Sequence, residues 1–424
     1  MTKMKRLLAT TSLLLSTSAA FVSRPRAGTA TTARCPLVDP LRISSATDSA
    51  PADTAPRAAS PLLDGFDHHS DDRLPYSEDG YLTWEWKTHH NPAYQAALET
   101  DDSPDKLKYQ KTYKVNYVEM GAPDDAEEDD KPVLLLVHGF GASAYHWRYN
   151  IPVLARKYHV YALDLLGFGW SDKPVQDYDA SVWRDQVVDF VHDVVLDGRR
   201  RDVAIAGNSL GGYTALFAST DERLGGVLKG TVLLNGAGQF RDPEAPPEEE
   251  VEKARPNPFV EAVSAAVQRF VIACSFIYTK QPMRIEQILR NVYPVTADMV
   301  DRDLVSSIHT PALDPDAPEV FFRVITRKGR GDQPLVDDLL KELKTPLLLA
   351  WGREDPWIKP AAADKIEVLH AEFHGENVGG SNGPRWVERV DIDAGHCPHD
   401  ENPEAVNKAI LEFAERVFSQ AVPA

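Results

Sequence analysis

Short apolar runs alternate with longer helical stretches from Gly80 onward. Runs rich in Val, Leu and aromatic residues predict strands, and apolar residues at helical spacing predict the helices between them. This alternation predicts an α/β fold with a mostly parallel eight-stranded sheet, flanking helices and an antiparallel edge pair formed by the first two strands. The predicted strands are 81–86, 113–119, 133–137, 159–163, 203–206, 231–234, 347–350 and 386–392. The predicted helices include 181–196, 212–220, 360–370 and 402–418.

One connection is far longer than the others. Residues 239–335 stand where a handful of residues would join two strands, so we expect a helical cap between a first core part, 80–238, and a second, 336–424. The cap sequence is apolar almost all round from Phe270 to Tyr278, which is more than one packed face requires. We expect most of these side chains to pack the cap onto the core, and the rest to line an apolar pocket or touch a membrane.

The first 38 residues contain Lys and Arg but neither Asp nor Glu. A basic start, an apolar run from Leu7 to Leu15 and small residues before Phe21 predict a signal peptide, because a membrane span needs about 20 apolar residues. The Arg-, Ser- and Thr-rich remainder of 1–38 is typical of a transit peptide, and the whole resembles the bipartite presequence of secondary plastids. A chloroplast address is therefore expected, with secretion as the alternative. Residues 39–79 are predicted to be a disordered linker.

Composition and charge limit the partners of this chain. The 46 Lys and Arg against 64 Asp and Glu give a net charge of −18, which argues against a nucleic-acid partner. A hydrophobic content of 43% is typical of a globular protein with a large core. The cysteines Cys35, Cys274 and Cys397 are too few and too scattered for a disulfide framework or a CxxC metal site.

The segment from Val203 to Gly212 places Ser209 in a Gly-x-Ser-x-Gly pattern between a predicted strand and a predicted helix. Such a tight turn strains the serine backbone and exposes its hydroxyl, and Gly207 and Gly211 remove side chains that would collide there. A chance Gly-Ser turn is the alternative, which the strand and helix on either side disfavour. Ser209 is therefore the candidate nucleophile.

A serine nucleophile needs a base and an orienting acid. His396 follows the last predicted strand, and Asp355 follows the preceding one, which gives the chain order Ser, Asp, His. Glu354 and Asp364 compete with Asp355, which is the preferred acid. Asn235, after the strand at 231–234, cannot accept as a carboxylate would.

The developing oxyanion needs two N–H donors. The amide of Leu210 at the helix start is one candidate, and the amide of Phe140, after the strand at 133–137, is the second. We interpret His138 in the same loop as a structural hydrogen-bonding residue. We expect no metal site, because His396, Cys397 and His399 crowd into four residues without a distant partner cluster. No cofactor is needed for this chemistry.

Beyond these residues, three longer motifs resemble the α/β-hydrolase family, and within it the plant and algal chloroplast branch that contains pheophytinase and chlorophyll dephytylase. The motifs are 138–152, 161–174 and 395–401, and the similarity covers roughly 80–418. The Gly-Asn-Ser-Leu-Gly elbow is similar to that of pheophytinases and differs from the Gly-His-Ser-Arg-Gly of chlorophyllases. Serine at position 209 disfavours dehalogenase or epoxide-hydrolase chemistry, for which this fold uses an Asp nucleophile.

Two functions from different classes follow from these motifs. The first is a serine esterase acting on a hydrophobic small-molecule ester with a long alkyl or isoprenoid part, for which the resemblance implies phytylated pigments as leading candidates. The second is a ligand-binding receptor or scaffold that keeps the fold with little turnover. The sequence favours the enzyme because every catalytic position is filled, although fold alone does not establish activity.

Overall fold

The computed structural model describes residues 72–88, 111–121, 131–242, 258–326, 333–375 and 386–419, without the side chains of 258–265. By its internal contacts the chain divides into two units, 1–57 and 58–424, and all described residues lie in the second. The predicted presequence and Cys35 lie outside the described residues, as does the predicted linker up to residue 71. The prediction of a disordered linker is wrong for its last residues, 72–79, because Leu74 is fully buried in the core and Arg73 donates to Asp301.

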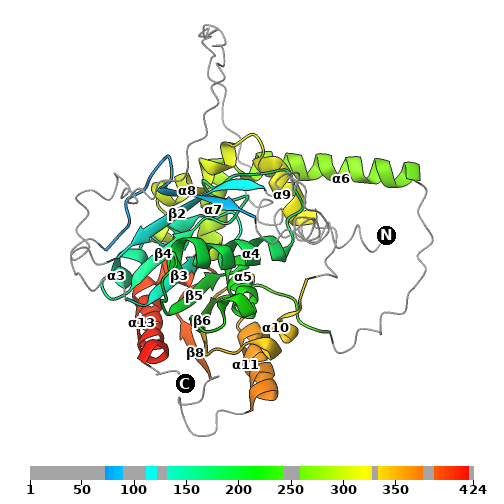
Figure 1. The fold of residues 1–424 in the computed structure, drawn as a ribbon. Coiled ribbons are helices and arrows are strands. Elements are labelled where there is room, and N and C mark those ends of the chain that lie inside the picture. The colour runs from blue at the N-terminus through cyan, green and yellow to red at the C-terminus, as the bar shows by residue number, and fades with distance from the viewer. Residues whose placement is uncertain are drawn as a thin grey trace, which may run out of the picture. The chain divides into compact units, whose positions relative to one another are not determined.

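An eight-stranded sheet forms the centre of the second unit (Figure 1), as the sequence predicted. Its order is β1-β2-β4-β3-β5-β6-β7-β8. β2 pairs antiparallel with β1 and β4, and all other neighbours are parallel. The strands are Leu82–Lys87 (β1), Thr112–Met120 (β2), Val133–Val137 (β3), His159–Leu163 (β4), Val203–Asn208 (β5), Leu228–Leu234 (β6), Leu347–Gly352 (β7) and Val387–Ile392 (β8).

β6 begins three residues earlier than the sequence predicts. The sequence pattern does not reveal these first residues of β6, because Gly230 interrupts the apolar run. The structure explains why glycine is needed there: a Cβ at Gly230 would lie 2.7 Å from the ring of Phe413. The close packing of a helix on the sheet, rather than a turn, therefore accounts for this residue.

The predicted helices are present with small shifts at their ends. The stretch predicted at 181–196 divides into α4 and a π-helix, Val191–Leu196 (η6). The α-helices are Ile151–Ala155 (α3), Ala180–Phe190 (α4), Leu210–Ser219 (α5), Pro258–Thr279 (α6), Pro282–Val292 (α7), Arg302–His309 (α8), Ala317–Thr326 (α9), Val336–Glu342 (α10), Ala361–His374 (α11), Pro398–Glu401 (α12) and Pro403–Ser419 (α13).

Alternate residues of the buried strands divide the core into two layers. In β3, Leu134 and Leu136 pack in the cluster that contains residues of α3 and α13. Leu135 points into the opposite cluster, together with residues of α4 and α5. Because successive strand side chains face opposite sides, a sheet covered by helices on both faces needs apolar residues at every position, as in β3.

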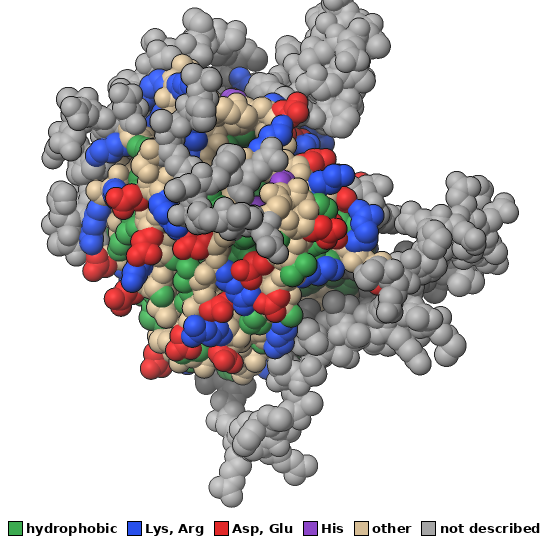
Figure 2. All heavy atoms as spheres, turned by 90° about the horizontal axis from the view of Figure 1, so that it is seen from below, with side chains coloured by type: hydrophobic (Ala, Val, Ile, Leu, Met, Phe, Trp, Pro, Cys, Tyr) green, Lys and Arg blue, Asp and Glu red, His purple; other side chains and the backbone are tan. Residues whose placement is uncertain are grey.

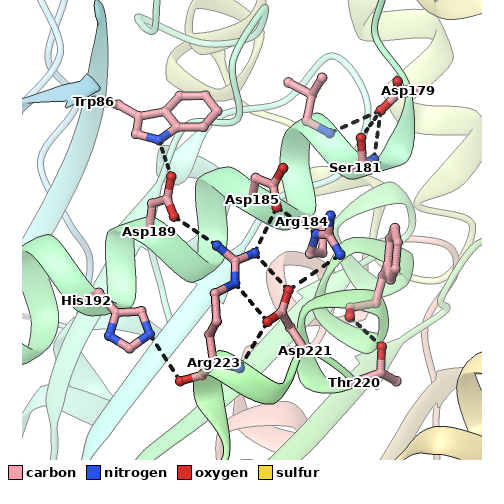
Figure 3. Close-up of polar contacts among 12 residues, drawn as sticks. Trp86, Asp179, Ser181, Arg184, Asp185, Asp189, His192, Thr220, Asp221 and Arg223 are labelled. Carbon is pink, nitrogen blue, oxygen red and sulfur yellow. Dashed lines mark hydrogen bonds and ion pairs between the residues drawn. The ribbon is translucent and has the colours of Figure 1, made fainter. Parts of the chain in front are cut away.

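Arg223, just after α5, connects this end of α5 to α4 by hydrogen bonds. Through Asp189 it also connects them to the edge strand β1 (Figure 3). Its guanidinium donates to Asp221, Asp185 and Asp189, and Asp189 accepts from the indole Nε1 of Trp86 at 2.8 Å. Burial alone would raise the pKa of Asp221, but its hydrogen bonds and charge interaction with Arg223 lower that pKa. The cluster is thus an ion-pair network that holds α4, the end of α5 and β1 together.

The face shown in Figure 2 carries interspersed acidic and basic side chains with apolar ones between them, and no continuous basic stripe among its described residues. Such mixing is typical of an ordinary solvated surface. Within the described ranges, no helix is both long and apolar enough to cross a bilayer.

Candidate active site

Ser209 lies between β5 and α5 with φ 54° and ψ −116°. This positive φ is strained for a residue with a side chain, and it places the serine on a sharp turn at the carboxyl end of β5. A Cβ at Gly207 would lie 2.1 Å from the carbonyl oxygen of Gly211, and one at Gly211 would lie 2.3 Å from the carbonyl oxygen of Val137. Both glycines are therefore required by close backbone approach. The Ser209 hydroxyl does not cap α5, although the residue occupies the N-cap position.

Asp355 and His396 form a buried pair at the carboxyl ends of β7 and β8. His396 Nδ1 lies 2.8 Å from Asp355 Oδ2, with the two residues 4% and 0% exposed. A carboxylate can only accept, so Nδ1 carries the proton and Nε2 keeps its lone pair. The other carboxylate oxygen accepts from the amides of Trp357 and Ile358. Burial alone would raise the pKa of Asp355, but the hydrogen bond and charge interaction with His396 and the two amides lower it.

The two rival acids lie elsewhere. Glu354 points into solvent, and Asp364, on α11, forms an ion pair with Arg389 at the surface. Of the three carboxylates considered from the sequence, Asp355 is the one bonded to His396.

Asn235 is a site residue whose role the sequence did not reveal. Its Nδ2 donates to Asp355 Oδ2 at 2.7 Å, the same oxygen that accepts from His396, and its Oδ1 accepts from the Gly352 amide at 2.8 Å. The residue has φ 45°, which asparagine tolerates better than most side chains. Its position directly after β6 was the available signal. Asn235, at the end of β6, thus holds by a hydrogen bond the carboxylate of Asp355, which follows the neighbouring strand β7.

The loop that carries His396 is held from two sides. Asn208, which precedes Ser209, donates from Nδ2 to the His396 carbonyl oxygen at 2.9 Å and to the Leu234 carbonyl oxygen at 3.0 Å. The His396 amide donates to the carbonyl oxygen of Val292, the last residue of α7, at 3.0 Å. The candidate base is therefore tied through its backbone to the elbow and to the helical insertion.

The loop after β3 approaches the elbow closely. A Cβ at Gly139 would lie 3.3 Å from Ser209 Cβ, so the backbone next to Phe140 borders the serine. Leu210 is the first residue of α5, where helix N–H groups have no partner within the helix. His138 is fully buried: its Nδ1 lies 2.7 Å from the Gly139 carbonyl oxygen, and its Nε2 accepts from the Leu165 amide. These contacts fit the structural role predicted for His138.

Aromatic rings connect this loop to the helical insertion. The ring of Phe140, 44% exposed, lies 5.9 Å from that of Phe321 on α9, which lies 5.1 Å from that of Phe276 on α6. Trp357, 46% exposed, lies with its ring 4.8 Å from that of His396. Apolar side chains thus border the candidate nucleophile and base.

The two described cysteines, Cys274 and Cys397, are free thiols. In the described part of the chain, no three His, Cys, Asp or Glu side chains are grouped so that they could hold a metal ion. His399 is fully buried behind the base loop, with its ring 4.3 Å from that of Trp147.

Comparison with known proteins adds to this geometry. The model of the alpha/beta hydrolase family matches residues 134–409, which is more than half of the chain. The chain belongs to the α/β-hydrolase family. Its eight-stranded sheet with helices on both faces is the fold of that family, and the fold predicted from the sequence is confirmed.

Several α/β-hydrolases resemble this chain over most of its length. The chloroplastic pheophytinase of Arabidopsis thaliana is 30% identical over 321 residues, which are 66% of this chain and 60% of that relative. The 2-hydroxy-6-oxo-6-(2'-aminophenyl)hexa-2,4-dienoic acid hydrolase of Metapseudomonas resinovorans is 35% identical over 289 residues, 67% of this chain and 84% of that relative. A solved membrane phospholipase A, described as a bacterial virulence factor, has a TM-score of 0.51 and 25% identity, covering 73% of this chain and 84% of its own. The chain is accordingly a hydrolase of this family.

Proposed function

We propose that the protein is a serine esterase that cleaves a hydrophobic carboxylic ester through an acyl-enzyme. The observation that carries this proposal is the 2.8 Å bond between His396 Nδ1 and Asp355 Oδ2, at the edge of the sheet where Ser209 occupies a strained turn. A neutral imidazole with its proton fixed on Nδ1 presents Nε2 as a base.

In the proposed reaction, Ser209 Oγ attacks the ester carbonyl carbon while its proton moves to His396 Nε2. Asp355 stabilises the resulting imidazolium, and the amides of Phe140 and Leu210 bind the oxyanion. The imidazolium then protonates the departing alcohol, which leaves the acyl group on Ser209. Water, deprotonated by His396, attacks the acyl carbon; the bond to Ser209 Oγ then breaks, the imidazolium returns its proton to Oγ, and the acid is released. No cofactor takes part in these steps.

The proposed substrate has a long alkyl or isoprenoid alcohol or acyl part. The exposed rings of Phe140 and Trp357 beside the candidate triad support an apolar substrate. The similarity to a chloroplastic pheophytinase supports phytylated pigments, with pheophytin or chlorophyll dephytylation in a plastid as the specific proposal. We further propose that 239–335 forms a cap inserted between core parts 80–238 and 336–424; the bond from His396 to Val292 supports this division.

Covalent labelling with a fluorophosphonate, combined with multiple-turnover hydrolysis of a generic acyl ester, tests the esterase proposal. We expect labelling of Ser209 and steady turnover. Labelling without turnover would favour the ligand-binding receptor, and absence of both would overturn the proposal. A panel of phytylated pigments, galactolipids and short esters then tests the substrate class, with Phe276→Ser expected to reduce the preference for long esters. Uniform preference for short esters, unchanged in Phe276→Ser, would contradict the substrate proposal.

A further inference from the structure

The helix α6 has two apolar faces, of which the structure buries one. Ile272 and Phe276 are 3% and 7% exposed, and they pack towards the rest of the insertion. The opposite side carries a second apolar stripe at helical spacing, which we call the outer α6 face. It consists of Val267, Phe270, Val271, Cys274, Ile277 and Tyr278, all exposed. Phe270 is 70% exposed and Ile277 is 57% exposed.

An apolar face of this kind differs from isolated surface residues, which are common and need no explanation. Its members recur along several turns on one side of a long helix, which Figure 1 draws beside α9. Met283, at the start of α7 and 69% exposed, extends the apolar surface beyond the end of α6. Burial of such a stripe against a partner would be favourable in proportion to the apolar area removed from water.

The charged side chains between Ala262 and Ile285 are basic, and Glu286, the next acidic residue along the chain, pairs with Arg290. From Ala262 to Ile285 the sequence contains Arg269, Lys280 and Arg284 and no Asp or Glu, in a chain whose net charge is −18. Arg269 is paired with Glu319 of α9, and the guanidinium of Arg284 lies 4.4 Å from the centroid of the Tyr278 ring.

An apolar helix face with basic side chains beside it is the chemistry that binds a membrane surface with anionic lipids. A second copy docked through the same face would place its own basic side chains against these, so it would bring no charge complementarity.

The buried side of α6 is also connected to the candidate active site through aromatic rings. Phe276, on the buried side of α6, contacts Phe321, which contacts Phe140 in the loop beside Ser209. These ring contacts join the buried side of α6 to the loop that borders the candidate nucleophile.

We propose that the outer α6 face docks on an anionic lipid surface, with Arg284, which lies over Tyr278, near the lipid phosphates and the apolar stripe among the acyl chains. The helix lies in the plane of the interface and the protein stays on one side of the bilayer. This inference goes beyond ester hydrolysis, because docking requires no reaction and can be measured in the absence of any substrate.

Cosedimentation of the full-length protein with vesicles tests the proposal. Two compositions are needed, phosphatidylcholine alone and phosphatidylcholine mixed with phosphatidylglycerol. We expect binding to the mixed vesicles, weaker binding to phosphatidylcholine alone, and loss of this difference at high salt, since salt screens the charge interaction. The double variant Phe270→Ser, Ile277→Ser should bind the mixed vesicles at least about tenfold more weakly, because each side chain loses its transfer into the apolar layer.

The matched control is Val368→Ser on α11, which replaces a side chain of similar exposure, 66%, outside the outer α6 face. It should bind vesicles like the wild type. Equal thermal unfolding midpoints for all three proteins would show that the fold is intact. Absence of vesicle binding by the wild type, or equal binding by the double variant, would overturn the proposal. A wild-type dimer in sedimentation equilibrium that the double variant dissociates would assign the face to a second copy instead.

Discussion

Asn235 Nδ2 donates to the carboxylate oxygen of Asp355 that also accepts from His396. Asn235 follows β6 and Asp355 follows β7, so two neighbouring strand ends cooperate in holding one carboxylate. A charged acceptor gains more from a hydrogen bond than a neutral one does. The amide therefore favours the ionised form of Asp355 and fixes the oxygen that orients the imidazole.

Asn235→Gly removes the amide while allowing the positive φ at this position. Loss of a hydrogen bond to a charged group costs about 1.5–3 kcal/mol, so we expect kcat for ester hydrolysis to fall roughly 10- to 100-fold with little change in KM. The pKa of Asp355 should rise, and its carboxylate should hold the imidazolium of His396 more strongly, which moves the acid limb of the pH–rate profile to higher pH. Asn235→Asp should move that limb further, because two carboxylates then share the site. An unchanged profile in both variants would show that Asn235 only supports the fold.

Ser209→Ala and His396→Ala should each remove nearly all esterase activity, by roughly 10⁴-fold or more, and leave the unfolding transition intact. Members of a triad act as a unit, so the double variant should lose little more than either single variant. Asp355→Asn should lose less, since it removes orientation rather than the nucleophile. Steady-state hydrolysis with thermal unfolding as the control measures these effects. Full activity in Ser209→Ala would end the serine esterase proposal.

Arg148 is fully buried and binds Asp400, also fully buried, through Nε at 2.7 Å. Arg148→Leu would leave the Asp400 charge buried without this partner, so we expect the free energy of unfolding to fall by about 3–5 kcal/mol. The double variant Arg148→Leu, Asp400→Asn should recover part of this loss. The control Arg290→Leu breaks an exposed pair with Glu286 and should cost less than about 1 kcal/mol. Equal losses for the buried and exposed pairs, in urea unfolding, would contradict this prediction.

Three buried histidines should make the protein less stable in mild acid. Burial lowers the pKa of His138 to about 4 and that of His146 to about 3, and it lowers the pKa of His399 well below its usual range. The unfolded chain takes up these protons near pH 6.5, so below that pH the unfolded state binds more protons than the folded one. The free energy of unfolding should therefore fall as pH drops from about 6.5 towards about 4. Burial raises the pKa of Asp164 to about 6 and also raises that of Asp400, and both carboxyl groups oppose this trend.

The histidine contribution can be isolated with His399→Phe, which keeps an aromatic ring against Trp147 and removes one titrating group. We expect the loss of stability between about pH 6.5 and pH 5 to become shallower by up to about 1.4 kcal/mol per pH unit. Urea unfolding at several pH values measures the slope for the variant and the wild type. A slope that is unchanged or steeper in the variant would show that His399 does not contribute.

The acid-free start of the chain predicts that residues before about position 40 are removed from the mature protein. Residues 1–60 fused to a fluorescent reporter should direct it to the plastid of a diatom, and the mature N-terminus should lie beyond the basic segment. Secretion of the reporter would support the alternative address. Retention in the cytosol would contradict any targeting role.

The sequence alone determined the strands, their alternation with helices and the elbow around Ser209. Each of these rests on a local signal, either a repeating apolar pattern or a glycine next to a turn, so neighbouring residues carry the information. The extra residues of β6 were missed because Gly230 broke the local pattern for a reason that lies in Phe413, far along the chain.

Tertiary structure alone decided which residues meet across the sheet edge. From the sequence, Asp355 was preferred over Glu354 and Asp364 as the acid, and packing brought Asp355 to His396. Packing also brought Asn235 to Asp355 and Asn208 to the loop of His396. It buried one apolar side of α6 and left the other exposed. The physical reason is that such contacts join residues 41 to 188 positions apart, or separate two faces of one helix. Only the folded arrangement of strands and helices fixes which side chains share a buried volume.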